Sequence, residues 1–285
     1  MDSTILISLT VLGGIGLFAA IILYVVSQKF KVEENPMIDE VEEALPGANC
    51  GGCGFPGCRG FATACCFAVD LGGLHCPVGG NDTMKNVAKI VGLSVVETKP
   101  KIAVLKCNGT CEHRPRINQY DGAQSCKIMH NLYIGETACH FGCLGLGDCE
   151  VACAFDALHV NPETGIPEID EEKCTACGAC VKACPKLLLE LRYKGPKGRR
   201  IYVACNNKEK GGIAKKACEV ACIGCGKCVK ACPHDAIILE NNLAYIVDDK
   251  CRLCTKCVDV CPTGSILKLN FPVKKKEVVE VTEQI

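Results

Sequence analysis

The sequence predicts an α+β protein with one N-terminal membrane helix and a cysteine-rich remainder, and three observations carry this prediction. The chain has 285 residues, of which 27 are cysteines. The phrase C-x2-C-x2-C-x3-C-P occurs three times in it. Residues 5–26 form an apolar run without a charged side chain. A cysteine content near one residue in eleven indicates a fold held together through sulfur.

Two kinds of sulfur chemistry compete for these residues, a disulfide framework and metal binding. Disulfide frameworks normally belong to short secreted chains, whereas this chain is long and its cysteine count is odd. The C-x2-C clusters therefore favour metal. The formal net charge is zero, so no overall field favours nucleic acid. Aromatic residues are few, and metal sites would add to a modest apolar core.

Residues 1–30 are predicted to form a single-pass membrane anchor. The apolar run 5–26 would span about 33 Å as a helix, enough for a bilayer core. A cleaved signal peptide would have basic residues before the run, but here Lys29 and Lys31 follow it. By the positive-inside rule, the soluble domains face the cytoplasm at the inner (plasma) membrane. Gly16 and Ala20 form a small-xxx-small pair that suits a partner helix.

Residues 31–95 are predicted to form a small module around one [4Fe–4S] cluster. Two short helices are expected, at "NPMIDEVEEALPGA" and "RGFATACCFAVDL". The glycine-rich stretch "NCGGCGFPGC" suits a loop whose amides point at cluster sulfurs. Cys65 and Cys66 lie outside this spacing and are expected to be free, packed side chains. The ligands of this first cluster follow C-x2-C-x4-C-x17-C and are Cys50, Cys53, Cys58 and Cys76.

The three repeated phrases have the bacterial ferredoxin spacing. In that spacing three thiolates bind one [4Fe–4S] cube, and the fourth binds the cube of a neighbouring run. Zinc is the alternative, but four-cysteine zinc sites use two pairs rather than a triplet, a fourth thiol and a proline. The runs are Cys174, Cys177, Cys180 and Cys184; Cys222, Cys225, Cys228 and Cys232; Cys251, Cys254, Cys257 and Cys261.

The last two runs pair into a ferredoxin-like domain at residues 213–270, which holds two clusters. A strand-like stretch, "AIILENNLAYIVDDK", separates them. Ligand crossover between the runs gives one cluster on Cys222, Cys225, Cys228 and Cys261, and a second on Cys232, Cys251, Cys254 and Cys257.

The run at 174 pairs with a degenerate copy, "CHFGCLGLGDCEVACAFDAL", to give a ferredoxin-like domain at residues 135–195. Ala154 replaces the proline of this copy, and its spacing is stretched. Whether Cys139 and Cys143 both bind therefore stays open, as does a cluster with fewer protein ligands. The expected sets are Cys139, Cys143, Cys149 and Cys184 for one cluster, and Cys153, Cys174, Cys177 and Cys180 for its neighbour.

Residues 96–134 are expected to be a connecting, cysteine-containing segment. "IAVLKCNGTC" and "IYVACNNKEKGG" both have the pattern of a strand followed by a turn. A sixth metal site stays open, although no four of the unassigned cysteines are local in sequence. Three histidines beside cluster cysteines, His75, His140 and His234, are expected to be surface or supporting residues rather than ligands. The unassigned cysteines are Cys107, Cys111, Cys126, Cys205 and Cys218.

Residues 196–212 are expected to be a basic linker, and 271–285 a disordered tail. The basic residues suit either a solvated loop or a surface that steers an acidic protein. The tail is charged and poor in apolar aromatic residues. The basic residues considered are Lys194, Lys197, Arg199, Arg200, Lys208, Lys210, Lys215 and Lys216.

The anchor, then "NCGGCGFPGCRGFA…HCPVGG", then "CHFGCLGLGDC", then ferredoxin repeats, resembles the B subunits of the Rnf complex. That family belongs to the ion-translocating ferredoxin:NAD+ oxidoreductase of bacterial membranes. The resemblance implies a subunit that accepts electrons from reduced soluble ferredoxin and relays them to membrane flavin subunits, through the at least five [4Fe–4S] clusters that the cysteine spacing predicts. It also implies Na+ or H+ transport and NAD+ reduction by the assembled complex.

The sequence itself shows no nicotinamide or flavin motif, so we expect partner subunits to supply those steps. Two alternatives remain at this stage. One is a related membrane complex that reduces a cytoplasmic redox-sensing regulator, and the other is a zinc scaffold without redox activity.

Overall fold

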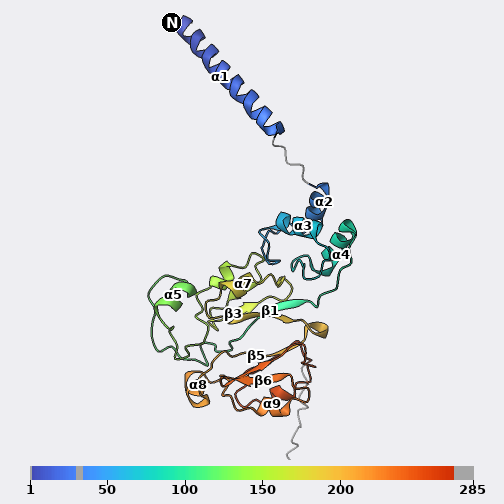
Figure 1. Ribbon diagram of the computed structural model, residues 1–285. Coiled ribbons are helices and arrows are strands. Elements are labelled where there is room, and N and C mark those ends of the chain that lie inside the picture. Colours follow the sequence, from blue (N-terminus) through green and yellow to red (C-terminus); the bar gives the residue numbers. More distant parts are fainter. Residues whose placement is uncertain (1, 30–34, 273–285) are drawn as a thin grey trace, which may run out of the picture.

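The computed structural model describes residues 2–29 and 35–272. Short helices and short strand pairs alternate along the chain, which confirms the α+β prediction. Figure 1 shows the helix α1 at one end, the helices α2 to α4 next, and two strand-containing units beyond them. The predicted disordered tail lies, from residue 273 onward, outside the described residues.

Helix α1 (Asp2–Lys29) contains the predicted membrane segment. Its part Ile7–Lys29 has 23 residues and a mean hydropathy of 2.5, and it is unburied. At 1.5 Å per residue this part is about 35 Å long, which exceeds a hydrocarbon core of about 30 Å. Among the described helices, α1 alone has the length and composition to cross a membrane.

The first unit consists of α2 (Pro36–Ala44), α3 (Cys58–Phe67) and α4 (Gly80–Val91). The two helices expected from the sequence are confirmed as α2 and α3. The side chain of Asn35 accepts a hydrogen bond from the Met37 N–H and caps α2, and Pro36 opens the helix. The three helices close around a small apolar core that includes Val41, Phe61, Cys65, Met84 and Val87.

Two units with the same strand plan follow. In each, an outer antiparallel pair joins the first and last strands, and a second pair forms an inner hairpin. The middle unit pairs β1 (Lys101–Leu105) with β4 (Leu189–Tyr193), and β2 (Leu158–Val160) with β3 (Pro167–Ile169). The far unit pairs β5 (Arg200–Val203) with β8 (Ile266–Leu269), and β6 (Ile237–Glu240) with β7 (Leu243–Ile246).

The strand-like stretch of the last repeat forms the β6–β7 hairpin. Asn241 and Asn242 occupy its tip with φ values of 48° and 60°. Positive φ at both central residues is the type I′ geometry that suits the twist of a hairpin, and asparagine tolerates it. The hairpin therefore separates the two cysteine runs of this unit by a fixed distance.

Short helices carry many of the cysteines. The helices α6 (Asp148–Val151), α7 (Ala179–Ala183) and α9 (Lys227–Ala231) each begin after a glycine with positive φ, for example Gly226 at 70° before α9. The helix α10 (Lys256–Asp259) begins after Thr255 at 65°. The left-handed residue lets the cysteine loop turn abruptly into one turn of helix. The remaining helices are α5 (Cys126–Leu132) and α8 (Gly211–Ala217).

Two segments expected to be connectors supply outer strands instead. Residues 101–105, inside the expected connecting segment 96–134, form β1, and residues 200–203, inside the expected linker 196–212, form β5. The physical reason is the apolar character of "IAVL" and "IYV", which the fold buries. The expected pattern of a strand followed by a turn is confirmed at both places.

The outer strands also join the two units. Ile102 and Val104 of β1 form a buried cluster with Tyr202 and Ala204. Arg192 of β4 is 2% exposed and donates across the boundary to Ile246 O and the Asp248 carboxylate. The cysteine loops of both units are therefore held in one packed body.

Candidate metal centres

In the far unit, four thiols surround one cavity. Its lining includes the predicted set Cys222, Cys225, Cys228 and Cys261. Gly224 has φ +65°, and a Cβ there would lie 2.7 Å from Asn242 O, so this loop position requires glycine. Burial alone would raise the pKa of Cys261, but hydrogen bonds from Ser265 and Thr263 lower it overall.

A second cavity in the far unit is lined by the other predicted set, Cys232, Cys251, Cys254 and Cys257. Ile201 of β5 and His234 line it as well. Burial raises the pKa of Cys257 to about 12, and Cys251 and Cys254 add to the shift because their negative charges would repel it. The crossover of Cys232 and Cys261 between the two cavities is the arrangement of a two-cluster domain.

The middle unit has a similar cavity, but with one unexpected thiol. Cys143, Cys149 and Cys184 line it as predicted, and the fourth cysteine is Cys126 rather than Cys139. The carboxylate of Asp148 accepts hydrogen bonds from the N–H groups of Cys126 and Lys127, at 2.8 and 3.0 Å. Asp148 thus fixes the start of α5 beside α6, and this brings Cys126 to the cavity. Cys139, which was expected in this set, does not line this cavity.

The other predicted set of the middle unit is gathered around α7. Burial raises the pKa of Cys180 to about 11, and the negative charges of Cys174, Cys177 and Cys153 add to the shift. Cys153 comes from the neighbouring run and packs against the same buried cluster as Cys180; that these four thiols share one metal cluster stays a prediction. In each unit the predicted fourth cysteine therefore reaches the thiols of the adjacent run.

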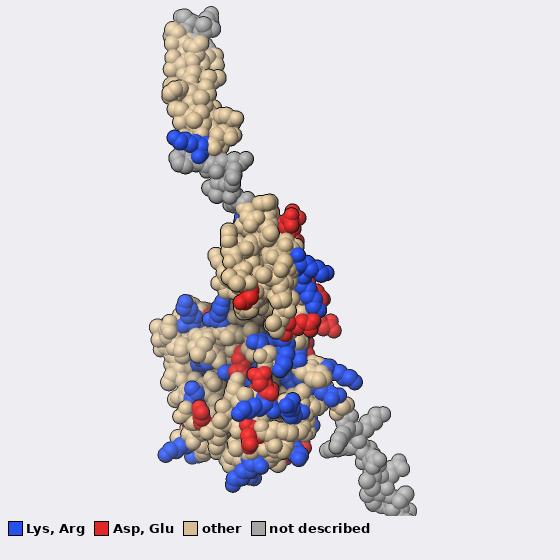
Figure 2. Space-filling view, turned by 45° about the vertical axis from the view of Figure 1, so that its right-hand side comes forward, with Lys and Arg blue, Asp and Glu red and all other residues tan. Residues whose placement is uncertain are grey.

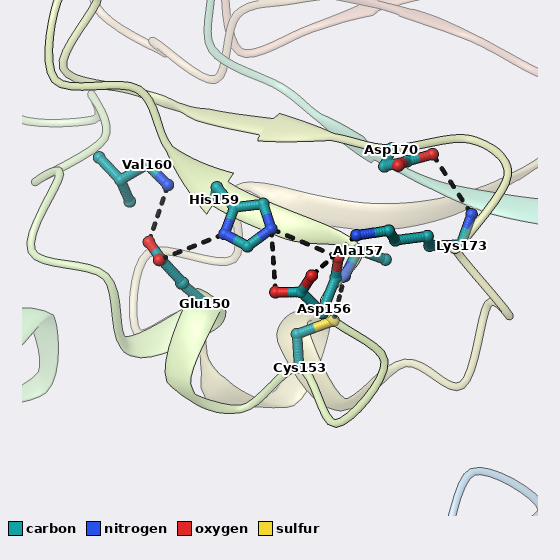
Figure 3. Close-up of polar contacts among 8 residues, drawn as sticks. All are labelled: Glu150, Cys153, Asp156, Ala157, His159, Val160, Asp170 and Lys173. Atoms are coloured by element: carbon teal, nitrogen blue, oxygen red, sulfur yellow. Dashed lines mark hydrogen bonds and ion pairs between the residues drawn. The ribbon is translucent and has the colours of Figure 1, made fainter.

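Figure 3 shows the surroundings of Cys153. The Ala157 N–H donates to Cys153 Sγ over 3.4 Å. His159 lies between two carboxylates, with Nδ1 3.4 Å from Glu150 Oε1 and Nε2 3.1 Å from Asp156 Oδ1. Lys173 binds Asp156 at 2.7 Å. This polar network ties α6, β2 and the loop before Cys174 to one another.

In the first unit, Cys50, Cys53, Cys58 and Cys76 line one cavity, as predicted. Asn49 Oδ1 accepts a hydrogen bond from the Cys58 N–H at 2.7 Å, which closes the loop at the start of α3. The Gly79 N–H donates to Cys76 Sγ over 3.4 Å. Cys65 lies in the apolar core, fully buried, and not in the cavity lining, as expected for a packed thiol.

Three of the five unassigned cysteines meet Cys139 elsewhere. Cys107, Cys139, Cys205 and Cys218 are all buried, with exposed fractions of 7–9%. Burial raises the pKa of Cys218, and the negative charges of Cys107 and Cys139 raise it further. Cys111, by contrast, is exposed. Cys139, which the sequence placed in a different cluster set, thus joins three cysteines that lie far apart in the sequence.

Four separate cavities are lined by these thiols, at the sites of Cys222, Cys126, Cys50 and Cys232. Within residues 2–29 and 35–272, no three His, Cys, Asp or Glu side chains are arranged to hold a single metal ion. The thiols are instead spread around the cavities, and N–H groups point at several sulfurs. This donor set fits a cube of iron and sulfide, whose sulfur ligands accept such hydrogen bonds.

The residues expected in a basic loop divide into two groups. Arg200 is buried and its guanidinium binds the Glu171 carboxylate, while Lys194 Nζ donates to Glu171 O at 2.8 Å. Arg200 therefore belongs to the fold and is not part of a docking surface. Four lysines that follow are exposed: Lys208, Lys210, Lys215 and Lys216.

The histidines beside the cysteines have separate surroundings. His75 contacts the hydroxyl of Thr98 at 3.2–3.3 Å. His140 is exposed, with Nδ1 3.9 Å from Glu209 Oε1. His234 is exposed and lines the cavity of Cys232.

Comparison with protein-family models gives three matches. A 4Fe-4S dicluster domain matches residues 215–269, and a 4Fe-4S binding domain matches residues 167–187. A model described as a putative Fe-S cluster matches residues 45–65. These segments contain cysteines of all three units, and they support iron–sulfur clusters in this chain.

Curated relatives match along most of the chain. The B subunit of the Na(+)-translocating ferredoxin:NAD(+) oxidoreductase complex of Acetobacterium woodii is 44% identical over 255 residues, which cover 88% of this chain and 74% of that protein. The chain belongs to the family of Rnf complex B subunits. The B subunit of the proton-translocating ferredoxin:NAD(+) oxidoreductase complex of Clostridium ljungdahlii is 41% identical, over 87% of this chain and 86% of that protein. In Methanosarcina acetivorans, the B subunit of an ion-translocating oxidoreductase complex is 39% identical, over 88% and 93%. The family resemblance inferred from the motifs is thus confirmed.

Some site residues of this Rnf family member were not apparent from sequence reasoning. Cys126 and Asp148 are 22 residues apart, and the hydrogen bond between them appears only in the folded chain. The pattern S-C-K at the start of a short helix gave a weak signal, since serine is a common helix cap. The isolated cysteines after β1 and β5 carried no spacing motif.

Proposed function

We propose that this chain is the electron-transfer iron–sulfur subunit of an ion-translocating ferredoxin:NAD+ oxidoreductase complex. The observation that carries the proposal is the set of thiol groups that continue from the far unit to the first unit. Each thiol group would hold a [4Fe–4S] cluster, which accepts and releases one electron without breaking a substrate bond.

The proposed ligand sets combine the sequence pattern with the cavities. They keep the predictions for four clusters and replace Cys139 by Cys126 in the fifth. Apart from the exposed Cys225 and Cys254, the thiols of these sets are buried or half-buried, and the potential of a cluster in such a setting depends on nearby donors and cations. The sets are Cys50, Cys53, Cys58 and Cys76; Cys126, Cys143, Cys149 and Cys184; Cys153, Cys174, Cys177 and Cys180; Cys222, Cys225, Cys228 and Cys261; Cys232, Cys251, Cys254 and Cys257.

Direct contact between units supports a continuous path. A Cβ on Gly52 would lie 2.8 Å from Cys177 O and 3.0 Å from Cys177 Cα, so the first-unit loop rests on the backbone of a middle-unit loop. These two loops carry predicted ligands of different clusters. The path therefore reaches the unit that lies nearest to α1 in the chain.

We place the entry of electrons at the far unit. Cys225 is one of the exposed cysteines, and Lys227, two residues later, lines the same cavity. Lys230 on α9 and the four exposed lysines 208, 210, 215 and 216 lie in the same unit. Such a surface would steer an acidic soluble ferredoxin toward the exposed edge of the cluster.

We further propose that α1 crosses the membrane once, with the cysteine-rich units in the cytoplasm. Figure 2 shows the described side chains of α1, from residue 7 onward, without charged atoms until the end next to these units, where Lys29 lies in the last turn. A basic residue at this end fits the cytoplasmic side. Partner subunits of the complex would bind flavin, reduce NAD+ and translocate Na+ or H+.

Ferredoxin-driven reduction of the purified chain tests the proposal. Reduced soluble ferredoxin should bleach the visible absorption of the chain under anaerobic conditions, and the rate should fall as salt is added. The double substitution Lys227→Gln and Lys230→Gln should lower the rate about tenfold at low salt and flatten its salt dependence.

A matched control exists in the middle unit. Lys182 occupies the same place in "ACVKACP" as Lys230 and is exposed. Lys182→Gln should leave the rate and its salt dependence unchanged. Equal effects of the two variants would remove the far unit as the docking site, and a chain that ferredoxin cannot reduce would contradict the proposed function.

A further inference from the structure

We propose that Cys107, Cys139, Cys205 and Cys218 form a sixth [4Fe–4S] site, which joins the electron paths of the middle and far units. The inference rests on the proposed electron-transfer function and extends it to a site of which only Cys218 lies within a segment matched by a family model. These four thiols come from four separate segments, and the fold gathers them at the boundary of the two units.

The outer strands bring two of the thiols together. Cys107 comes two residues after β1, and Cys205 comes two residues after β5. The Asn108 N–H donates to Ala204 O at 2.9 Å, which ties the two strand ends to each other. Two strands that both belong to buried outer pairs thus deliver one cysteine each to the same place.

The other two thiols arrive from loops that pack on these strand ends. Cys218 follows α8, and a Cβ on Gly109 would lie 3.3 Å from Cys218 Sγ. Cys139 lies in the same buried cluster as Cys205 and Cys218. Burial raises the pKa of Cys139, and Cys107 adds to the shift, so these two thiols also lie close to each other. All four cysteines are free of disulfides.

A buried asparagine donates to two of these sulfurs. Asn207 is 1% exposed; its N–H lies 3.4 Å from Cys205 Sγ, and its Nδ2 lies 3.6 Å from Cys139 Sγ. Glu209 accepts from the same Nδ2 at 3.3 Å and holds the amide in place. Donors aimed at sulfur stabilise thiolate ligands and tune the cluster that they hold.

Buried positive charge points to an anionic group at this place. Arg114 is 5% exposed, and its guanidinium donates to Gly109 O, Cys143 O and the Thr137 hydroxyl. Lys186 Nζ, half-buried, donates to Ile134 O at 2.9 Å and His140 O at 2.8 Å. Among the described residues, neither cation has a carboxylate within ion-pair distance. A buried charge needs compensation, and a cluster held by four thiolates supplies negative charge.

The position of the site closes a gap in the path. Cys222, a far-unit ligand, lies in the same buried cluster as Cys139, Cys205 and Cys218. On the other side, Cys107 belongs to the buried cluster against which Cys143, a middle-unit ligand, packs. The four thiols therefore lie between the cluster of Cys222 and the cluster of Cys143. One electron that enters the far unit would pass through this site to the middle unit.

The test is the metal content of the full chain, purified without oxygen in detergent. Cys218→Ala and Cys205→Ala should each lose about four irons and four acid-labile sulfides per chain, the content of one cube. The controls Cys111→Ala, at an exposed thiol, and Cys65→Ala, at a buried core thiol, should keep the iron of the parent.

The outcomes separate the site from the proposed function. A parent without iron and sulfide contradicts the proposed function itself. If the parent holds about twenty irons per chain and both alanine variants keep them, only the sixth site is overturned. The same holds if the alanine variants lose one zinc instead of four irons.

If either alanine variant loses more than one cube, the variant Arg114→Gln tests whether the sixth site exists. It should keep all iron and move one midpoint potential to a more negative value, because the buried cation favours the reduced cluster. A tenfold change in the reduction equilibrium is 59 mV for one electron. Potentials that all stay in place would overturn the site.

Discussion

Hydrogen bonds to sulfur recur at the last cysteine of three of the four runs. Ala157 N–H donates to Cys153 Sγ and Leu188 N–H donates to Cys184 Sγ, both over 3.4 Å. At the corresponding place in the last run, the Ser265 hydroxyl lies 3.4 Å from Cys261 Sγ. The residue four positions after the cysteine thus repeatedly faces its sulfur. Because such donors favour the more negative state of a cluster, they set its potential.

Ser265→Ala is predicted to move the potential of the Cys222 cluster to a more negative value, since the reduced state loses a donor. Tens of millivolts are expected, where about 59 mV is a tenfold change in a one-electron equilibrium. Redox titration followed by electron paramagnetic resonance measures the shift. Thr263→Val is the matched control, because its hydroxyl lies 3.8 Å from the same sulfur and should matter less. An equal or positive shift in Ser265→Ala would count against this role.

At the residue scale, the cysteine spacing predicted the thiols that line most of the cavities. It did not predict that Cys126, and not Cys139, lines the cavity of Cys149. The run spacing led to the sets in the far unit, because three closely spaced thiols leave one arrangement around a cube. Cys126 could not be found in this way. Its approach to Cys149 depends on hydrogen bonds between Asp148 and the start of α5, which join residues distant in the sequence.

At the scale of elements, the first and middle units meet where two cysteine loops approach each other closely. Gly52 faces the backbone of Cys177, and its own φ is not in the left-handed region. Glycine is therefore required here because a Cβ would collide with the neighbouring loop, and not because of the backbone conformation. Neighbouring backbone atoms cannot move aside as a flexible side chain would.

Gly52→Ala is predicted to loosen this contact, since overpacking of this kind costs about 1–3 kcal/mol. Hydrogen exchange should rise at the two loops, residues 49–54 and 175–178, while the iron content stays at the parental value. Gly212→Ala is the control, because a Cβ there meets no atom within 4 Å and α8 gains helix propensity. Unchanged exchange in Gly52→Ala would show that the two loops do not rest on each other.

Strand pairing was the element-level feature that local patterns described least well. The apolar runs at β1 and β5 indicated strands, but their partners β4 and β8 lie about ninety and seventy residues away. A pairing over such a distance depends on how the cysteine loops fold between the strands. This is why residues 96–134 and 196–212 looked like connectors in the sequence.

At the scale of the whole molecule, the units follow one another from the far unit to α1, as Figure 1 shows. The anchor and the order of the cysteine modules were readable from the sequence, because each depends on local composition or spacing. The junction of the middle and far units was not, since Cys107, Cys139, Cys205 and Cys218 converge only after both outer strand pairs form. The proposed sixth site, which has no spacing motif in the sequence, is the one that would connect the two units.

The measurement that tests the account most directly is the iron, sulfide and zinc content of the oxygen-protected chain, taken together with its paramagnetic resonance during dithionite titration. The account predicts equal amounts of iron and acid-labile sulfide, about 24 of each per chain for six cubes, and signals of reduced [4Fe–4S] clusters that appear in successive steps. Colourless protein that contains zinc, lacks sulfide and gives no signal on reduction would contradict it.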